Sequence, residues 1–215
     1  MGNFTTLTLF VVMTASAALA HAEPTAWCPD AVIDGVSAES LKDYAVVVEG
    51  ERIVAVKPQS ALEEPSNCRR LVGTTLLPGL INGHEHPLIY ADDYQGAHLA
   101  GSSAYKALLG LAALQNMLRH GWTTVRVMGD ADVYYGNQDI HRVIEAGVFH
   151  GPRITGAAHY LSITGGGGDV NYLSPEQAIV ADGLIVDGAD AVRKAIREEI
   201  KYRSEEHTSE LQSPC

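Results

Sequence analysis

The chain has 215 residues, of which 46% are hydrophobic and 19% are charged, a composition typical of a globular protein with one large or two small domains. Its formal net charge of −11 argues against a nucleic-acid partner, because binding to phosphates needs a basic face. The pair Arg69-Arg70 is too short to form such a face.

An uncharged apolar run covers residues 7–20 and is followed by small residues and a polar break. This pattern predicts a signal peptide over residues 1–22, so we expect a periplasmic or secreted protein that is free of the membrane after cleavage. The competing interpretation is a membrane anchor, but the run is shorter than the about 20 apolar residues that span a bilayer.

Residues 23–75 contain short β-rich runs separated by turn residues, which predicts a small antiparallel β module. The predicted strands are 31–34, 44–48, 52–56 and 70–72, with a hairpin loop at 49–51. Cys28 and Cys68 lie towards the two ends of this module. In an exported chain an even pair of cysteines favours a disulfide, and two unpaired buried thiols are the alternative.

An apolar run over residues 76–83 leads into His84 and His86, which are separated by one residue. On a strand, side chains two positions apart leave the same face, so we expect the two imidazoles to point the same way and Glu85 to point oppositely. A His-x-His pair alone is a weak motif. Its position at the end of a buried strand, after a Pro-Gly turn signal, favours half of a metal site.

Alternating helices and strands follow, which predicts parallel β/α architecture. The expected elements are a helix over 102–120, a strand over 122–128, a helix over 138–146, a strand over 152–159, a long loop over 160–175 and a helix over 190–201. About three β/α units fit either an opened TIM barrel or a small doubly wound sheet.

Several polar residues of these units are candidates for the site. Arg126 on a predicted strand could bind a carboxylate or pair with an acidic neighbour such as Asp130, and His159 ends the next strand, where barrel active sites lie. The glycines at 165–168 lack the lysine of a phosphate loop and predict a mobile active-site loop, in which Asp169 either orients a ligand or a histidine or forms a turn. Four further histidines, on helices or in helix-flanking loops, are expected to face solvent: His98, His120, His141 and His150.

The last 13 residues, 203–215, break the preceding helical pattern. They look like the translation of a sequencing-library adapter, so we expect an artefactual tail that includes Cys215, with a natural polar tail as the alternative. The natural sequence is expected to continue differently after about residue 202.

The stretch LPGLINGHEH (77–86), placed between a small β module and β/α units, resembles the amidohydrolase superfamily of metal-dependent hydrolases. GWTTVR (121–126), GPRI (151–154) and ITGGGGD (163–169) look like the branch related to Xaa-Pro dipeptidases and imidazolonepropionase. Gly167 stands where relatives of this branch usually have histidine, and Val127 where many have aspartate.

This resemblance implies an α/β fold class. Residues 76–202 would form the N-terminal part, the first three β/α units, of a TIM-like (β/α)8 metallo-hydrolase barrel, and residues 23–75 a small β-sandwich-type module before it. His84 and His86 match the ligands that the family carries on its first barrel strand. They would hold one or two divalent metals, expected to be zinc.

The implied reaction is hydrolysis of an amide or other C–N bond by a metal-activated water, in a dipeptide, Xaa-Pro or N-acyl amino acid type substrate. Arg126, His159 and Asp169 are the candidate substrate-binding residues. The general base and the other metal ligands of the family are expected beyond residue 202. Lys201 is not taken as the lysine that the family carries on a later strand, because it lies on a predicted helix. The 215-residue chain is therefore expected to be inactive alone. The alternative is a non-catalytic secreted binding protein made of the β module and a small α/β sheet.

Overall fold

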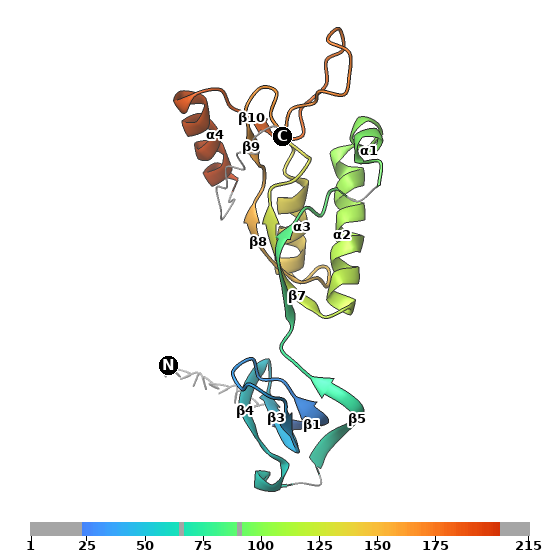
Figure 1. Cartoon of the computed structure of the whole chain (residues 1–215), viewed down its shortest axis with the longest axis vertical. Helices are drawn as coiled ribbons and strands as arrows, with labels where there is room; N and C mark the ends of the chain where they lie inside the picture. Colours follow the sequence, from blue (N-terminus) through green and yellow to red (C-terminus); the bar gives the residue numbers. More distant parts are fainter. Residues whose placement is uncertain (1–22, 65–66, 90–91, 203–215) are drawn as a thin grey trace, which may run out of the picture. The chain divides into compact units, whose positions relative to one another are not determined.

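A computed structural model describes residues 23–64, 67–89 and 92–202 and divides the chain into two compact units, residues 1–78 and 79–215 (Figure 1). The predicted signal peptide and the predicted artefactual tail lie outside the described residues. Within the described ranges, no helix combines the length and the apolar character needed to span a membrane.

The first unit is a five-stranded sheet in which β1 contacts three other strands. Its elements are β1 (Thr25–Val32), β2 (Leu41–Lys42), β3 (Tyr44–Glu49), β4 (Arg52–Pro58), a 3-10 turn η1 (Gln59–Ala61) and β5 (Cys68–Leu76). β1 pairs antiparallel with β2 and β3, and β3 pairs antiparallel with β4 across the predicted hairpin. β5 runs parallel to β1, so the prediction of a wholly antiparallel module is wrong. A tight hairpin would force two strands to run antiparallel, but none joins β5 to β1. β5 is therefore able to run parallel to β1.

Cys28 and Cys68 form a disulfide with a Cα–Cα distance of 5.9 Å, within the range that this bond requires. Both lie within strands rather than before them, since Cys28 is on β1 and Cys68 begins β5. Ala26 and Cys68 are register partners, so the bridge lies along the parallel β1–β5 pair. The bond therefore links the first and last strands of the unit.

One consequence of a single sheet is that several apolar side chains of the first unit stay exposed. Ile53 is 66%, Val54 52% and Val72 78% exposed. Among the described residues of this unit no second sheet packs on the first, so the expected sandwich stays a prediction.

Replacing both Cys28 and Cys68 by serine should destabilise the first unit by about 4 kcal/mol, because the bridge closes a loop with a sequence separation of 40 residues. Urea denaturation followed by tryptophan fluorescence measures this loss in a Trp122→Phe background, which leaves Trp27 as the reporter. In the oxidised, denatured wild-type chain, thiol titration should find one reactive thiol, from Cys215. Three reactive thiols would contradict the bridge.

The second unit contains a three-stranded parallel sheet with the order β6-β7-β8, as the alternating pattern predicts. Its elements are β6 (Leu80–Glu85), α1 (Tyr94–Ala100), α2 (Ser103–Arg119), β7 (Trp122–Met128), α3 (Gly136–Glu145), β8 (Arg153–Ala157), β9 (Leu161–Ser162), β10 (Leu184–Ile185) and α4 (Ala189–Lys201). Helices α2 and α3 pack on each other and on the sheet, α2 against β7 and α3 against β8 (Figure 1). The buried apolar cluster between them comprises Leu88, Leu111, Leu114, Val125, Val127, Ile140 and Ile154.

Local signals explain the ends of the longest helix. The Ser102 hydroxyl accepts a hydrogen bond from the Tyr105 N–H at the start of α2, which satisfies one of the free N–H groups there. Gly121 follows the helix with a φ of +92°, a conformation that glycine adopts at no steric cost. Two features were not predicted, helix α1 and the short parallel pair β9–β10, of which β9 lies within the expected loop over 160–175 and β10 lies after it.

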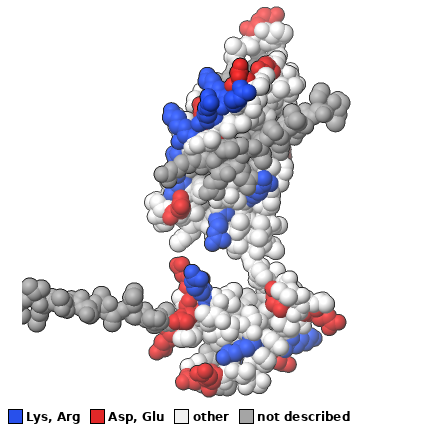
Figure 2. Space-filling model, turned by 90° about the vertical axis from the view of Figure 1, so that its left-hand side faces the viewer, with Lys and Arg blue, Asp and Glu red and all other residues white. Residues whose placement is uncertain are grey.

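Charged side chains on the outer helices pair locally. Arg193 on α4 contacts Asp190, and Arg142 on α3 lies 2.8 Å from Asp139. In Figure 2 several basic side chains of the second unit gather in a band with a few acidic side chains among them, whereas acidic and basic side chains are mixed on the first unit. Exposed pairs of this spacing add only about 0.3–0.5 kcal/mol each, so the second unit depends on its apolar cluster.

Candidate metal centre and adjoining pocket

The two histidines at the end of β6 point the same way, as their spacing predicts. Their Nε2 atoms are 3.0 Å apart, and the ring centroids are separated by 4.9 Å with the planes nearly perpendicular. The register of β6 against β7 shifts between Asn82 and Glu85, which is a bulge-like irregularity. Within it, Asn82 accepts a hydrogen bond from the His84 N–H and donates one to Glu85. These contacts hold the bend from which both imidazoles project.

His86 is oriented by a main-chain group of the neighbouring strand end. Its Nδ1 lies 2.7 Å from the carbonyl oxygen of Gly129, just after β7. A carbonyl oxygen only accepts, so Nδ1 carries the hydrogen and, in the neutral ring, Nε2 presents a lone pair towards His84. Metal-binding histidines commonly donate their second ring N–H in this way.

The position that holds His86 has no room for a side chain. Gly129 has a φ of +94°, and a Cβ built on it would lie 2.3 Å from the Tyr160 nitrogen and 2.6 Å from the His159 carbonyl carbon. The backbone after β8 therefore packs directly on the residue that orients His86. Any larger residue at 129 would have to displace one of the two.

A buried carboxylate ties the same two strand ends together. Both Asp130 oxygens accept from the Leu88 N–H, at 3.0 and 3.1 Å, and one also accepts from the Ala131 N–H. Burial raises the pKa of the Asp130 carboxyl well above its usual value, and the hydrogen bonds from these two N–H groups oppose that shift. The clamp fixes the chain immediately after His86.

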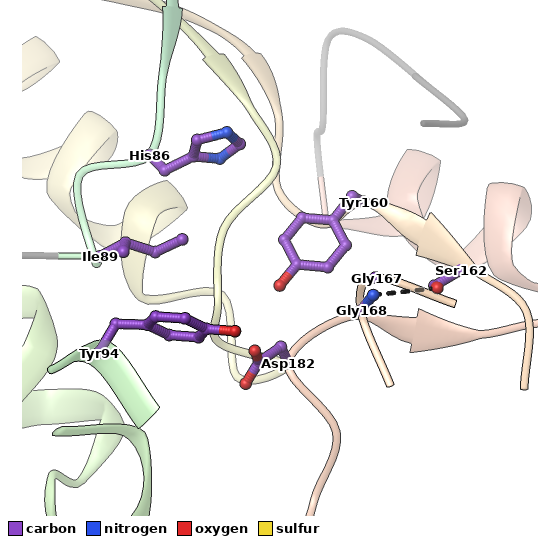
Figure 3. Close-up of a pocket in the computed structure, with 8 residues that line it drawn as sticks. All are labelled: His86, Ile89, Tyr94, Tyr160, Ser162, Gly167, Gly168 and Asp182. Atoms are coloured by element: carbon purple, nitrogen blue, oxygen red, sulfur yellow. Dashed lines mark hydrogen bonds between the residues drawn. The ribbon is translucent and has the colours of Figure 1, made fainter. Parts of the chain in front are cut away.

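A pocket of about 140 Å³ adjoins this centre (Figure 3). Its lining residues are His86, Ile89, Tyr94, Tyr160, Ser162, Gly167, Gly168 and Asp182. The glycine-rich loop lies against it, because the Gly168 N–H donates to the Ser162 hydroxyl. This loop was expected to approach a ligand, and the structure places two of its glycines in the pocket wall.

His159 lies in a buried network rather than in the pocket wall. Its side chain is fully buried, and Nδ1 lies 2.6 Å from Glu199 Oε1 on α4. The Tyr135 hydroxyl donates to the same oxygen at 3.2 Å, and the His159 N–H donates to the other at 3.3 Å. Burial, followed by the nearby Glu199 carboxylate, raises the pKa of Tyr135, so its hydroxyl stays a donor. The second ring nitrogen of His159, Nε2, is buried without a hydrogen-bond partner.

The other predicted site residues have different surroundings. Asp169 accepts a hydrogen bond from the Gly165 N–H at 2.9 Å, which corresponds to the turn-forming alternative. Arg126 lies on β7 and is half-buried, and the Asp130 carboxylate is occupied by backbone N–H groups. Neither Arg126 nor Asp169 lines the pocket at His86.

One prediction about the remaining histidines is wrong. The His98 side chain is only 8% exposed, its Nδ1 lies 3.0 Å from Asp182 Oδ1, and its Nε2 donates to the Val180 carbonyl oxygen. Helix α1, which the sequence pattern did not predict, carries it inwards. His120 and His150 are exposed as expected, and His141 is half-buried.

The model of the amidohydrolase family matches residues 75–211, which is more than half of the chain. The chain belongs to the amidohydrolase family. This match starts just before β6 and contains the two histidines, the pocket and the buried network.

Individual relatives cover different parts of the chain. Ochratoxinase of Aspergillus niger is 25% identical over 185 residues, which are 76% of this chain and 37% of that protein. Imidazolonepropionase of Arthrobacter sp. strain FB24 is 44% identical over 66 residues, which are 29% of this chain and 16% of that protein. A prolidase solved with N-methylphosphonate-L-proline is 28% identical with a TM-score of 0.70, covering 89% of this chain and 48% of the other. The chain thus spans less than half the length of each of these relatives.

The residues that complete the site were not recognised from the sequence. Gly129 carried one available signal, a glycine directly after a buried strand and beside an aspartate. Asp182, Tyr94 and Glu199 carried none, because they come from a loop and two helices that only the folded chain brings to the strand ends.

Replacing Glu199 by alanine should destabilise the second unit by roughly 3 kcal/mol, since it leaves two buried donors of His159 unpaired. Tyr135→Phe removes one hydrogen bond to the same carboxylate and should cost only about 1 kcal/mol. Urea denaturation monitored by circular dichroism compares the two variants. Equal losses would show that the carboxylate does not bind His159 in solution.

Proposed function

We propose that this family member is a metal-dependent hydrolase of amide bonds whose metal is bound by His84 and His86. The observation that carries the proposal is the hydrogen bond from His86 Nδ1 to the Gly129 carbonyl oxygen, which turns Nε2 towards His84 Nε2. Family membership supports the reaction type, and the proteins named above include a prolidase and an ochratoxinase.

The donor set fits a divalent metal such as zinc. Two imidazole nitrogens that converge within 3.0 Å, one with its tautomer fixed by a carbonyl, are favourable zinc ligands. Within residues 23–64, 67–89 and 92–202 no third histidine, cysteine or carboxylate joins them. We therefore propose that further ligands and a general base come from other residues of the natural protein, and that the 215-residue chain does not turn over substrate alone.

When bound, the metal would polarise the scissile carbonyl and activate a water for attack. The residues of this chain have other tasks. Gly129 keeps the hydrogen of His86 on Nδ1, Asp130 holds the following turn, and the pocket receives part of the substrate. Substrates of the dipeptide, Xaa-Pro or N-acyl amino acid type are part of the proposal. Arg126 and His159 do not line this pocket, so they stay candidate contacts only for a part of the substrate that lies outside it.

The proposal extends to architecture and location. The parallel β6-β7-β8 sheet supports three strands of a TIM-like barrel. The Cys28–Cys68 bridge supports an oxidising compartment, hence a periplasmic or secreted protein.

Calorimetric titration of the metal-free chain with zinc tests the central claim. We expect one zinc site that His86→Asn weakens at least tenfold, because it removes a ligand, whereas His120→Asn, at an exposed histidine, leaves it unchanged. If both variants bind zinc as tightly as the wild-type chain, His86 is excluded as a ligand. Metal-dependent turnover of Xaa-Pro dipeptides by the purified chain would refute its inactivity. The substrate class is tested by sequencing the gene again past codon 202 and assaying the protein that its natural reading frame encodes.

Gly129→Ala should weaken zinc binding by roughly tenfold to a hundredfold, as loss of the partner of a ligand typically does. The added Cβ would push the Gly129 carbonyl away from His86 or displace the backbone at 159–160. Gly147→Ala is the matched control, since Gly147 also has positive φ, +71°, but a Cβ added there would meet nothing within 4 Å. Equal affinities of the two variants would show that the Gly129 contact does not orient His86.

A further inference from the structure

The pocket beside His86 has two chemically different ends. His86 lies at one end, and Asp182 and Tyr94 lie at the other (Figure 3). The hydroxyl groups of Tyr94 and Tyr160 and the carboxylate of Asp182 point towards one another in this view. None of the eight described lining residues is a lysine or an arginine. The far end therefore presents hydrogen-bond acceptors without a cationic side chain in its wall.

Asp182 is unusual among these groups because it is buried. The residue is 3% exposed, and its Oδ1 is a buried oxygen without a hydrogen-bond partner. His98 Nδ1 lies 3.0 Å from Oδ1, but the two atoms lack the alignment of a hydrogen bond. A buried carboxylate with unused acceptor capacity is costly unless something else completes it.

The charge of the Asp182 carboxylate affects the pKa of a neighbouring side chain. Burial, followed by the Asp182 carboxylate, raises the pKa of Tyr172 to about 12. Burial also raises the pKa of Asp182 itself, and the opposing charges of His98 and Lys106 lower it. His98 and Lys106 lie near Asp182, yet neither lines the pocket, so neither places a cation within it.

We propose that the Asp182 end of this pocket binds the cationic amino group of the substrate, so that the substrate is an amide with a free amine on its acyl side. This inference rests on the proposed hydrolase function, which places the scissile carbonyl at the His86 end. An ammonium group has three N–H donors and no acceptor, and it matches one carboxylate and two phenol oxygens. The aromatic faces of Tyr94 and Tyr160 also favour a cation.

Other groups suit this end less well. A substrate carboxylate would meet the Asp182 carboxylate, and an apolar group would bring no hydrogen-bond donor to it, so that the buried oxygen would keep only its contact with His98. A volume of about 140 Å³ is below the roughly 300–1,000 Å³ of a typical ligand pocket, so it suits one end of a substrate. The proposal separates two substrate types within the proposed function, because a dipeptide has the free amine and an N-acyl amino acid does not.

Binding of n-propylammonium and of 1-propanol to the metal-free chain tests this site, because the two probes differ in one charged group. We expect n-propylammonium to bind at least tenfold more tightly in an NMR titration, with shifts at Tyr94, Tyr160 and Gly168. Asp182→Asn should reduce its affinity about tenfold or more, and Tyr94→Phe by a smaller factor. Asp190→Asn is the matched control, since the Asp190 side chain is 99% exposed.

Equal binding of the two probes, or an unchanged affinity in Asp182→Asn, would overturn the proposal. If that variant fails to fold, the affinity of Tyr94→Phe and the comparison of the two probes still test the proposal. A second pair, L-alaninamide and N-acetyl-L-alaninamide, should show the same preference for the free amine. Because the amine probes are titrated without metal, the two experiments are independent. Absence of amine binding would not change the zinc result, and absence of zinc binding would not change the amine result.

Discussion

The hydrogen bond from His86 Nδ1 to the Gly129 carbonyl oxygen is the contact on which the candidate site depends. It joins the ends of β6 and β7, sets the tautomer of His86 and determines where the free ring nitrogen points. The Asp130 clamp on Leu88 reinforces the same junction further along each strand end. Together these contacts make the position of an imidazole depend on the pairing of two parallel strands, which the buried apolar cluster under them stabilises.

Several charged and polar side chains of the second unit are buried, and their burial is tolerable because hydrogen bonds or ion pairs satisfy them. Lys106 is 5% exposed, donates to the Ala131 carbonyl oxygen at 2.6 Å and lies 3.6 Å from Asp132. Glu199 is similarly satisfied by His159 and Tyr135. Buried side-chain atoms of the described residues that lack a hydrogen-bond partner include His159 Nε2 and, despite its 3.0 Å contact with His98, Asp182 Oδ1. Such atoms indicate places where a ligand or further chain can complete the bonding.

The sequence predicted the order of the β/α elements well, since β7 and the start of α2 follow from apolar periodicity and a serine cap, which are local properties. It also predicted that His84 and His86 share a face, because side chains two positions apart on a strand leave the same face, but it did not predict the bend between Asn82 and Glu85 from which they project. The parallel direction of β5 and the inward position of His98 were missed, since both depend on contacts distant in the chain. For the same reason Asp182, far beyond His86 in the chain, was not expected at the same pocket.

The acceptor for His86 is a main-chain oxygen, whereas the far end of the pocket is made of side chains. Substitution elsewhere cannot delete a backbone carbonyl, but a single codon change can replace Asp182 or Tyr94. Substitutions at the far end would therefore alter the pocket while the orientation of His86 is preserved. The chemistry of this pocket can thus diverge without any change at the strand junction that orients His86.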